Sequence, residues 1–370
     1  MLRSLLASAS VSVGRDEDAR AILEAQAARA AEAGLPEDHP LLVGDTLRLA
    51  EALERLGARA EADEAFELAI ELAVSRFGTA SNAAQRAREK RAVALLGRGR
   101  LPEAARVAAE IESLDAGREG ADERGPLLAL LRAKLAFGRR DLATAEREFE
   151  AAQRAAAVDP ATHISLDLAA CAGQARCLAA RGERDEALRV LEDGLRRRRA
   201  YEATGLPRPR CIEVMDQLVA LLPKTEQDRR LALATEVLEE LTKMEGADAR
   251  NTRVASLNLA SLAFGYREFA RADRAYEPLF ELEKTGFLAG RDRSLMNQYA
   301  FAGCAALRAG RPEVALPRLL RAYELCEKGL GFETGSGRQV PGFLVEAYTA
   351  LERPEDAARL REKHAALFEK

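Results

Sequence analysis

The side chains that could carry out catalysis or bind a metal are few and far apart in this sequence. The three histidines are His39, His163 and His364, and no two cysteines are spaced as Cys-x-x-Cys. A zinc site needs several His or Cys ligands, and a reactive thiol needs a nearby cationic or basic group. We therefore predict no metal site, no cofactor and no enzymatic activity for this chain.

Structural roles explain the histidine and cysteine positions better than chemistry does. His39 lies in the loop motif Asp38-His39-Pro40, where we expect it to cap the helix that follows. Cys171 and Cys177 fall six residues apart on one predicted helix, so they point to different faces and are expected to pack. The five cysteines are odd in number, which indicates reduced thiols and a cytoplasmic protein.

Two glycine motifs have the composition of phosphate-binding loops but not their context. Gly97-Arg98-Gly99 and Gly335-Ser336-Gly337 neither follow a predicted strand nor end in Gly-Lys-Ser/Thr. The first motif is simply the end of a predicted helix and the turn after it. We therefore predict no nucleotide binding.

The run Arg196-Arg197-Arg198-Arg199 is the one sharp basic patch in the sequence. It falls at the end of a predicted helix, where cations suit the negative end of the helix dipole. We interpret the run as a solvated helix end. A contact with an acidic partner or RNA is the alternative, although only Tyr201 offers an aromatic ring for base stacking.

Composition indicates a chain of packed helices. Hydrophobic residues make up 48% of the 370 residues, aromatic residues only 5% and charged residues 31%, and there is no Trp. The net charge of −4 provides no general attraction for nucleic acid or an anionic membrane. No apolar run reaches membrane length, and the stretch after Arg3 is too short for a secretion signal. These features exclude nucleic-acid and membrane partners from our prediction.

The clearest pattern is a marker alanine that recurs about every 42 residues. A small residue lies twelve positions before most markers, and a larger apolar residue lies four positions after most of them, with Ala108 and Arg361 as exceptions. Residues four apart share one helix face, and small residues let helix axes come close. The markers are Ala19, Ala62, Ala104, Ala145, Ala187, Ala272, Ala315 and Ala357, with a degenerate copy near Ala232. The small residues are Ala7, Ala50, Ala92, Ala133, Ala175, Ala260 and Gly303.

Each repeat reads as a helical hairpin. A Gly-containing turn separates the small residue from the marker, which predicts a first helix of about 15 residues and a second of about 18. Stretches with strand periodicity are absent, so the predicted fold is all-α, with about nine hairpins in one array. The approximate units are 1–35, 36–79, 80–121, 122–161, 162–205, 206–248, 249–288, 289–334 and 335–370, of which 206–248 is degenerate.

The segment from Asn258-Leu259-Ala260 to Phe269-Ala270-Arg271-Ala272 resembles the tetratricopeptide repeat family, in the longer variety found in kinesin light chains and bacterial signalling proteins. The resemblance covers nearly the whole chain and implies a right-handed α-solenoid. It departs from the family in lacking Trp. It also departs at Pro223, which marks the sixth unit as a kink or a seam.

The resemblance further implies a concave groove lined by the first helix of each repeat. Residues flanking the small position would line it, and Asn258 is the strongest single candidate because a groove Asn in this family grips a peptide backbone. The first five units lean basic there, which favours a partner with an acidic segment. Solvated helix faces are the competing interpretation. The candidate groove residues are Arg48, Glu51, Lys90, Lys134, Arg176, Asn258, Ser261, Asn297, Arg308 and Glu346.

These patterns favour a scaffold that binds a protein or peptide, because stacked repeats create a long surface without providing reactive groups. An alternative is the C-terminal sensing or docking region of a bacterial Ser/Thr kinase or another signalling protein. That alternative draws on Met1, which falls inside the first predicted helix with no capping residue before it. A peptide-responsive transcription regulator is disfavoured because no separate basic helix-turn-helix unit is present.

Overall fold

The computed structural model describes residues 20–25, 28, 32, 34, 39–115, 125–206, 209, 211–247, 250–284, 292–332 and 335–368. Ala7, Ala19 and the predicted start of the first helix at Met1 lie outside these residues. The described residues form helices and turns without a strand, which confirms the all-α prediction. Contacts divide the chain into unit 1, Met1–Pro223, and unit 2, Lys224–Lys370.

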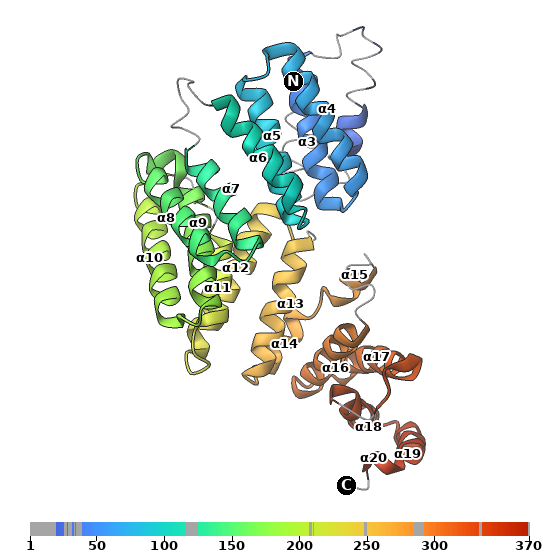
Figure 1. The fold of residues 1–370 in the computed structure, drawn as a ribbon. Coiled ribbons are helices and arrows are strands. Elements are labelled where there is room, and N and C mark those ends of the chain that lie inside the picture. The colour runs from blue at the N-terminus through green and yellow to red at the C-terminus, as the bar shows by residue number, and fades with distance from the viewer. Residues whose placement is uncertain are drawn as a thin grey trace. The chain divides into compact units, whose positions relative to one another are not determined.

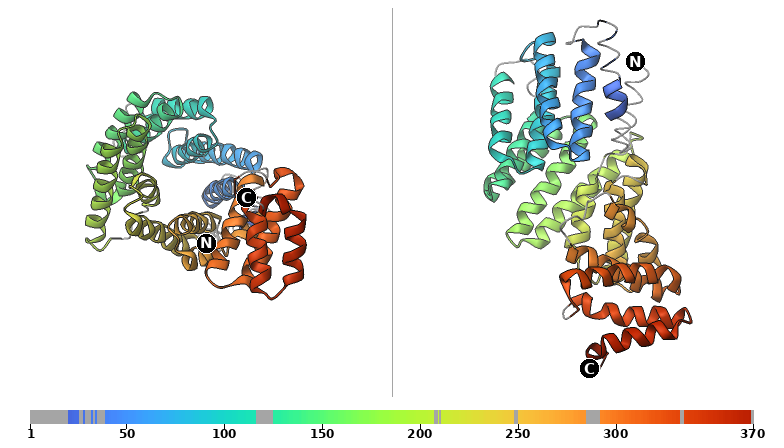
Figure 2. Two further views of the ribbon diagram at one scale, coloured as in Figure 1. Left: turned by 90° about the horizontal axis from the view of Figure 1, so that it is seen from below. Right: turned by 90° about the vertical axis from the view of Figure 1, so that its right-hand side faces the viewer.

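Unit 1 is a series of antiparallel helices packed in chain order (Figures 1 and 2). Each hairpin consists of a first helix and a second helix joined by a short turn. The first helices are α3 (Pro40–Leu56), α5 (Asn82–Gly97), α7 (Gly125–Gly138), α9 (Pro160–Ala180) and α11 (Ile212–Leu221). The second helices are α4 (Arg59–Phe77), α6 (Leu101–Asp115), α8 (Leu142–Ala156) and α10 (Arg184–Glu202).

Unit 2 continues the hairpin pattern with more irregularity. Pro278 follows the first segment of one second helix, which is therefore broken into α14 and α15, a break that the sequence pattern did not predict. The helices are α12 (Gln227–Glu245), α13 (Arg250–Gly265), α14 (Phe269–Ala275), α15 (Leu279–Lys284), α16 (Asp292–Arg308), α17 (Pro312–Leu325), α18 (Val340–Ala350), α19 (Pro354–Lys363) and α20 (Ala365–Phe368). A π-helical turn, η2 (Cys326–Leu330), and a 3-10 turn, η3 (Gly335–Gln339), connect α17 to α18.

The marker alanines form the core of the stack, as the sequence predicted. Every described marker from Ala62 to Ala357 is buried, and so is every described small residue from Ala50 to Gly303. In the degenerate sixth repeat, Ala232 itself is exposed, whereas its neighbours Leu231 and Ala234 are buried. The count of about nine hairpins and the right-handed winding stay predictions from the sequence.

The sixth repeat departs from the repeat pattern because Pro223 ends its first helix early. Leu222 adopts an extended conformation with ψ 141°, as expected for a residue before proline, and α11 ends at Leu221 after only 10 residues. The contact division of the chain falls directly after Pro223.

Seven described hairpins have a left-handed residue at one fixed position of the turn, five residues before the marker, whereas the turn between α11 and α12 has none. Glycine occupies it at Gly57, Gly99, Gly182 and Gly310, which confirms the predicted role of glycine in ending the first helix. In three other hairpins, however, the same position holds Arg140 (φ 63°), Arg267 (φ 65°) and Glu352 (φ 56°). The left-handed conformation is thus a property of the turn rather than of glycine.

Large apolar side chains of the second helices pack against the next hairpin. Phe149 of α8 lies against Gly173 of α9, where a Cβ added to the glycine would stand 2.1 Å from the Phe149 ring. Phe66 of α4 belongs to a buried cluster that includes Ala94 of α5. These contacts bury the face that a single hairpin would leave exposed.

Arginines in the turns also join one repeat to the next. An acidic residue directly after the marker accepts from an arginine in the following turn: Glu146 Oε2 lies 2.5 Å from Arg181 Nη1, and Asp63 Oδ1 lies 3.0 Å from Arg98 Nη1. Asp273 is only 1% exposed and pairs with both Arg311 (2.8 Å) and Arg318 (2.6 Å). Other carboxylates pair with an arginine one turn along the same helix, as Glu186 does with Arg189, so ion pairs act both within helices and between repeats.

We predict that Arg140→Gly stabilises the protein. A non-glycine residue in the left-handed region costs about 1–2 kcal/mol, and the extra backbone entropy of glycine offsets about half of that. The free energy of unfolding, measured by urea denaturation, should therefore rise by about 0.5–1 kcal/mol. Arg139→Gly, at the neighbouring position without positive φ, should lower it; a gain from both changes would contradict this account.

We predict that Gly173→Ala destabilises unit 1, because the new methyl group would overlap the Phe149 ring. Overpacking of this kind costs about 1–3 kcal/mol. Gly97→Ala is the matched control, since it also lies in a helix but its Cβ would meet nothing within 4 Å. Thermal denaturation should show a lower melting temperature for the first variant and an equal or higher one for the second.

Candidate functional site

The first helices of the hairpins in unit 1 form a continuous face, here called the A-face. Contacts join α3 to α5, α5 to α7, α7 to α9 and α9 to α11. Among the described helices, contacts of that extent do not join α4 to α6, α6 to α8 or α8 to α10. Because helices on the inner side of a curved stack are closer together than those on the outer side, the A-face is the concave side of unit 1.

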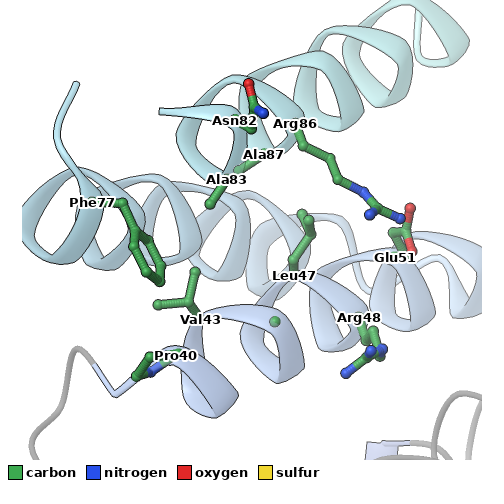
Figure 3. Close-up of a pocket in the computed structure, with 11 residues that line it drawn as sticks. Pro40, Val43, Leu47, Arg48, Glu51, Phe77, Asn82, Ala83, Arg86 and Ala87 are labelled. Atoms are coloured by element: carbon green, nitrogen blue, oxygen red, sulfur yellow. The ribbon is translucent and has the colours of Figure 1, made fainter. Parts of the chain in front are cut away.

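A pocket of about 350 Å³ lies on the A-face between α3 and α5. Its wall is apolar and includes Val43, Leu47 and Ala87, and the ring of Phe77 from the end of α4 closes one side (Figure 3). Arg48, Glu51 and Arg86 bring charged groups to the other side. The remaining lining residues are Pro40, Gly44, Asn82 and Ala83.

Most charges around this pocket are compensated within the protein. Lys90 Nζ lies 2.7 Å from Glu51 Oε1, and Arg48 Nη1 lies 2.7 Å from the buried Asp45 Oδ1. Arg86 is exposed and extends along the pocket toward Glu51 (Figure 3), and it makes no ion pair with the described part of the chain. The positive charge expected from the sequence at this face is therefore largely neutralised around the pocket, and only a small excess remains.

A second group of predicted residues meets farther along the A-face, on α7, α9 and α11. Arg176 lies 3.5 Å from Glu213 and 5.9 Å from the centre of the Phe137 ring. Lys134 lies partly buried nearby and forms no ion pair with any described residue. Burial lowers the pKa of Lys134, Arg176 lowers it further, and Glu213 opposes the shift.

The candidate residues of unit 2 lie on α13, α16 and α18. Asn258 is exposed, and Ser261 Oγ lies 3.5 Å from both Tyr276 Oη and Gln298 Oε1. Asn297 is half-buried and directly precedes Gln298 in the sequence. Arg308 pairs with Glu346 at 2.6 Å, which joins consecutive first helices.

The structure thus places Arg48 and Glu51 in the lining of one pocket, with Lys90 paired to Glu51 beside it, and brings Lys134 near Arg176 at a second place. Sequence reasoning missed Phe77 and Arg86. Phe77 lies at the end of a second helix, outside the repeat pattern, and its side chain is 46% exposed. A large apolar residue at such a position was the sequence signal that could have identified it. Arg86 lies one helical turn before Lys90 on the same face, so a wider search along that face would have found it.

The remaining reactive side chains occupy structural positions. All five cysteines are buried and unpaired, which confirms that they pack. Burial raises the pKa of Cys171 to about 12 and that of Cys177 to about 11, so both remain thiols at neutral pH. Among the described residues, no group of three His, Cys, Asp or Glu could hold a metal ion, and no helix could span a membrane.

His39 and His364 likewise have structural partners. His39 accepts from the Leu41 amide at the start of α3, which confirms the predicted cap. His364 Nε2 lies 2.7 Å from Tyr323 Oη in a cluster that includes the Phe332 ring. Burial lowers the pKa of His364, so its ring is neutral at pH 7.

The arginine run in α10 is not a uniformly solvated helix end. Arg198 is 1% exposed and donates to Glu202 and to Met215 Sδ, and Arg197 pairs with the buried Asp167. Only Arg196 and Arg199 are exposed. The interpretation from sequence is therefore wrong for half of the run, because α11 and α9 cover that side of the helix.

No protein-family model matches the sequence, and no curated protein is similar to it. Solved structures match in fold. A Signal Transduction ATPase with Numerous Domains from Pyrococcus horikoshii, with a tetratricopeptide repeat sensor, matches with a TM-score of 0.52 and 11% identity over 95% of this chain and 53% of that chain. The match thus spans about half of the ATPase.

Two further structures show a looser likeness. One contains the nearly identical TPR-like repeats of a kinesin light chain from Podosopora anserina, with a TM-score of 0.40 and 21% identity over 55% of this chain and 94% of that chain. The other is a Rap protein complexed with Competence and Sporulation Factor, with a TM-score of 0.45 and 12% identity over 99% and 96% of the two chains. The likeness to the sensor of the ATPase, with its TM-score of 0.52, shows a fold of tetratricopeptide-like repeats, as the sequence indicated.

We predict that Lys134→Met stabilises unit 1. The variant removes a partly buried ammonium that no described carboxylate pairs with, so the free energy of unfolding at pH 7 should rise by about 1 kcal/mol. Lys243→Met, on the exposed surface of α12, is the control and should change it by less than about 0.5 kcal/mol.

The pH dependence of that difference provides a second check. The folded pKa of Lys134 lies below the unfolded value of 10.5, so the unfolded chain binds more protons between the two. As pH rises through this range, the free energy of unfolding of the wild type should increase relative to that of the variant. A difference that does not shrink with rising pH would contradict the assigned cause.

Proposed function

We propose that this protein is a non-catalytic scaffold that binds a segment of another protein on the A-face of unit 1. The observation that carries the proposal is the pocket between α3 and α5, which combines an apolar wall with charged groups at one edge. The pocket lies on the concave side, where a partner can contact several first helices at once. Capture of a partner segment along this face, in the cytoplasm, is the function that the geometry supports best.

The chemistry of the pocket favours an amino-acid side chain as its occupant. A cavity of about 350 Å³ is small for a drug-sized ligand but accommodates one or two apolar side chains. Val43, Leu47 and Phe77 would remove such side chains from water, which is the main source of binding free energy at peptide sites. Phe77 is 46% exposed, so a partner that covers its ring would remove apolar surface from water.

The charges at the edge favour a partner that also carries a carboxylate. Arg86 makes no ion pair with the described residues, and its guanidinium can donate two parallel hydrogen bonds to one carboxylate. Lys90 and Arg48 add positive charge, although Glu51 and Asp45 offset most of it. One acidic residue beside one or two apolar residues is thus the smallest partner motif that fits the pocket.

The described side chains support binding rather than catalysis. An enzyme would need a nucleophile or base with a pKa shifted toward neutrality and a partner that activates it. Burial raises the pKa of the Cys171 thiol, away from neutrality, and the Nε2 atom of His364 lies within hydrogen-bond distance of Tyr323 Oη.

The second candidate function, sensing or docking within a signalling protein such as a bacterial Ser/Thr kinase, would use the same A-face. It differs in what the scaffold is attached to, not in how it binds. An in-frame kinase domain encoded upstream of residue 1 would support this candidate. A separate gene for the array would remove it.

We predict that peptides selected by the protein bind at the pocket. The full chain, immobilised, is used to select binders from a random-peptide display library, and enriched peptides are measured by fluorescence polarisation. Phe77→Ala and Arg86→Glu should each weaken binding about ten-fold or more, as expected for a central apolar anchor and a charge-assisted contact.

Matched controls separate the pocket from the general surface. Leu68→Ala removes an apolar side chain that is equally exposed, 47% against 46% for Phe77, but lies on α4 outside the pocket. Arg106→Glu reverses an exposed charge on α6. Both controls should bind as the wild type does. Failure to enrich any peptide, or equal losses in all four variants, would refute the proposal.

A further inference from the structure

The junction between α6 and α7 differs from the other junctions of unit 1. At the position four residues after the marker, α4 carries Phe66 and α8 carries Phe149, and both side chains are buried against the next hairpin. The corresponding residue of α6 is Ala108. At this position α10 carries the buried Leu191, so among the four junctions of unit 1 only α6–α7 lacks a large apolar side chain there.

The same junction also lacks the ion pair found at two of the turns, as does the α10–α11 junction, where Leu188 follows the marker. Asp63 pairs with Arg98, and Glu146 pairs with Arg181, where each arginine lies six residues before the next marker. Arg139 occupies that arginine position in the hairpin of α7 and α8, but the carboxylate position on α6 is Ala105. Arg139 forms no ion pair within the described ranges.

Aliphatic contacts keep the junction closed in the structure. Val107 and Ile111 of α6 pack in one cluster with Leu128, Leu131 and Leu135 of α7. Leu101 lies against Gly138, where an added Cβ would stand 2.7 Å from its side chain. Glu112 and Arg132 pair across the junction at 2.6 Å, but both are exposed, so that pair contributes little.

The extent of packing agrees with these residue differences. Among consecutive described helices from α3 to α11, α6 and α7 are the least extensively packed pair. Segments of a protein open locally where buried contacts are fewest. The junction thus has three shortages together: no large apolar side chain, no ion pair at the turn, and the smallest packed surface.

We infer that the α6–α7 junction is a joint at which unit 1 opens into two rigid blocks, α3–α6 and α7–α11. Opening changes the distance between α5 and α7 on the A-face, and hence between Lys90 and Lys134. The joint lets the two halves of the binding surface adjust to the length of a partner segment. The adjustment of the surface to a partner rests on the proposed function, whereas the opening of the α6–α7 junction does not depend on it.

Thiol labelling in the absence of any partner tests the opening. Ala108→Cys places a reporter thiol in the joint, at a position where other repeats hold Phe or Leu. Cys177, buried in the cluster of α7, α8 and α9, is the internal reference, and mass spectrometry follows each thiol separately. We expect the reporter to be labelled at least ten-fold faster than Cys177.

Equal labelling rates for the two thiols would show that only global unfolding exposes the joint and would overturn the inference. Val107→Cys provides a second reporter in the same interface if the first variant does not fold. Neither measurement needs a ligand, so failure of the proposed function leaves the result interpretable.

A designed ion pair tests the cause. Ala105→Glu, added to the reporter variant, supplies the carboxylate that Asp63 and Glu146 supply elsewhere and should slow labelling by about three- to five-fold through Arg139. Ala105→Gln should not slow it, and Arg139→Gln should abolish the effect of Ala105→Glu. An unchanged rate in Ala105→Glu would contradict the assigned cause.

A peptide selected at the pocket then tests the adjustment. A peptide whose binding weakens on charge reversal at both Lys90 and Lys134 contacts both blocks, so it should slow labelling of the reporter about ten-fold when saturating. Unchanged labelling with such a peptide bound would overturn the adjustment while leaving the opening in place.

Discussion

Stacking of consecutive hairpins is the constraint on which the rest of this structure depends. A hairpin of two helices has apolar surface on more than one side, and only its neighbours can bury it. The close approach this requires explains the fully buried alanines at the markers and at the small positions. Phe149 against Gly173 shows the same principle with a large side chain and a glycine. The concave A-face is the consequence, since first helices are drawn closer together than second helices.

Electrostatics refines this stack rather than creating it. Turn arginines reach carboxylates about one repeat away, and the pair of Arg318 and Asp273 is almost entirely buried. A buried pair of this kind is costly to break, because removal of one partner leaves the other charged and unsolvated. Such pairs favour one register of neighbouring hairpins. Where they and the large apolar residues are both missing, at α6 and α7, the stack is held mainly by aliphatic contacts, with one exposed ion pair between Glu112 and Arg132.

The repeat period and the buried alanines could be predicted because they recur in sequence and depend on local helix geometry. The left-handed turn residues Arg140 and Glu352 could not, since the demand comes from the turn and not from the residue. Contacts between repeats were also missed, because their partners lie about 40 residues apart. Of the residues that line the pocket, Arg48 and Glu51 are among the predicted groove residues because they follow the helix period, whereas Phe77 comes from outside that pattern.

The account claims above all that the A-face of unit 1 binds a protein segment. Hydrogen exchange of the full chain, with and without a saturating selected peptide, tests this most directly because it reports where the backbone becomes protected. Slower exchange concentrated in α3 and α5, with α4 and α6 little changed on their exposed sides, is the predicted result. Protection confined to the second helices, or to unit 2, would contradict the claim.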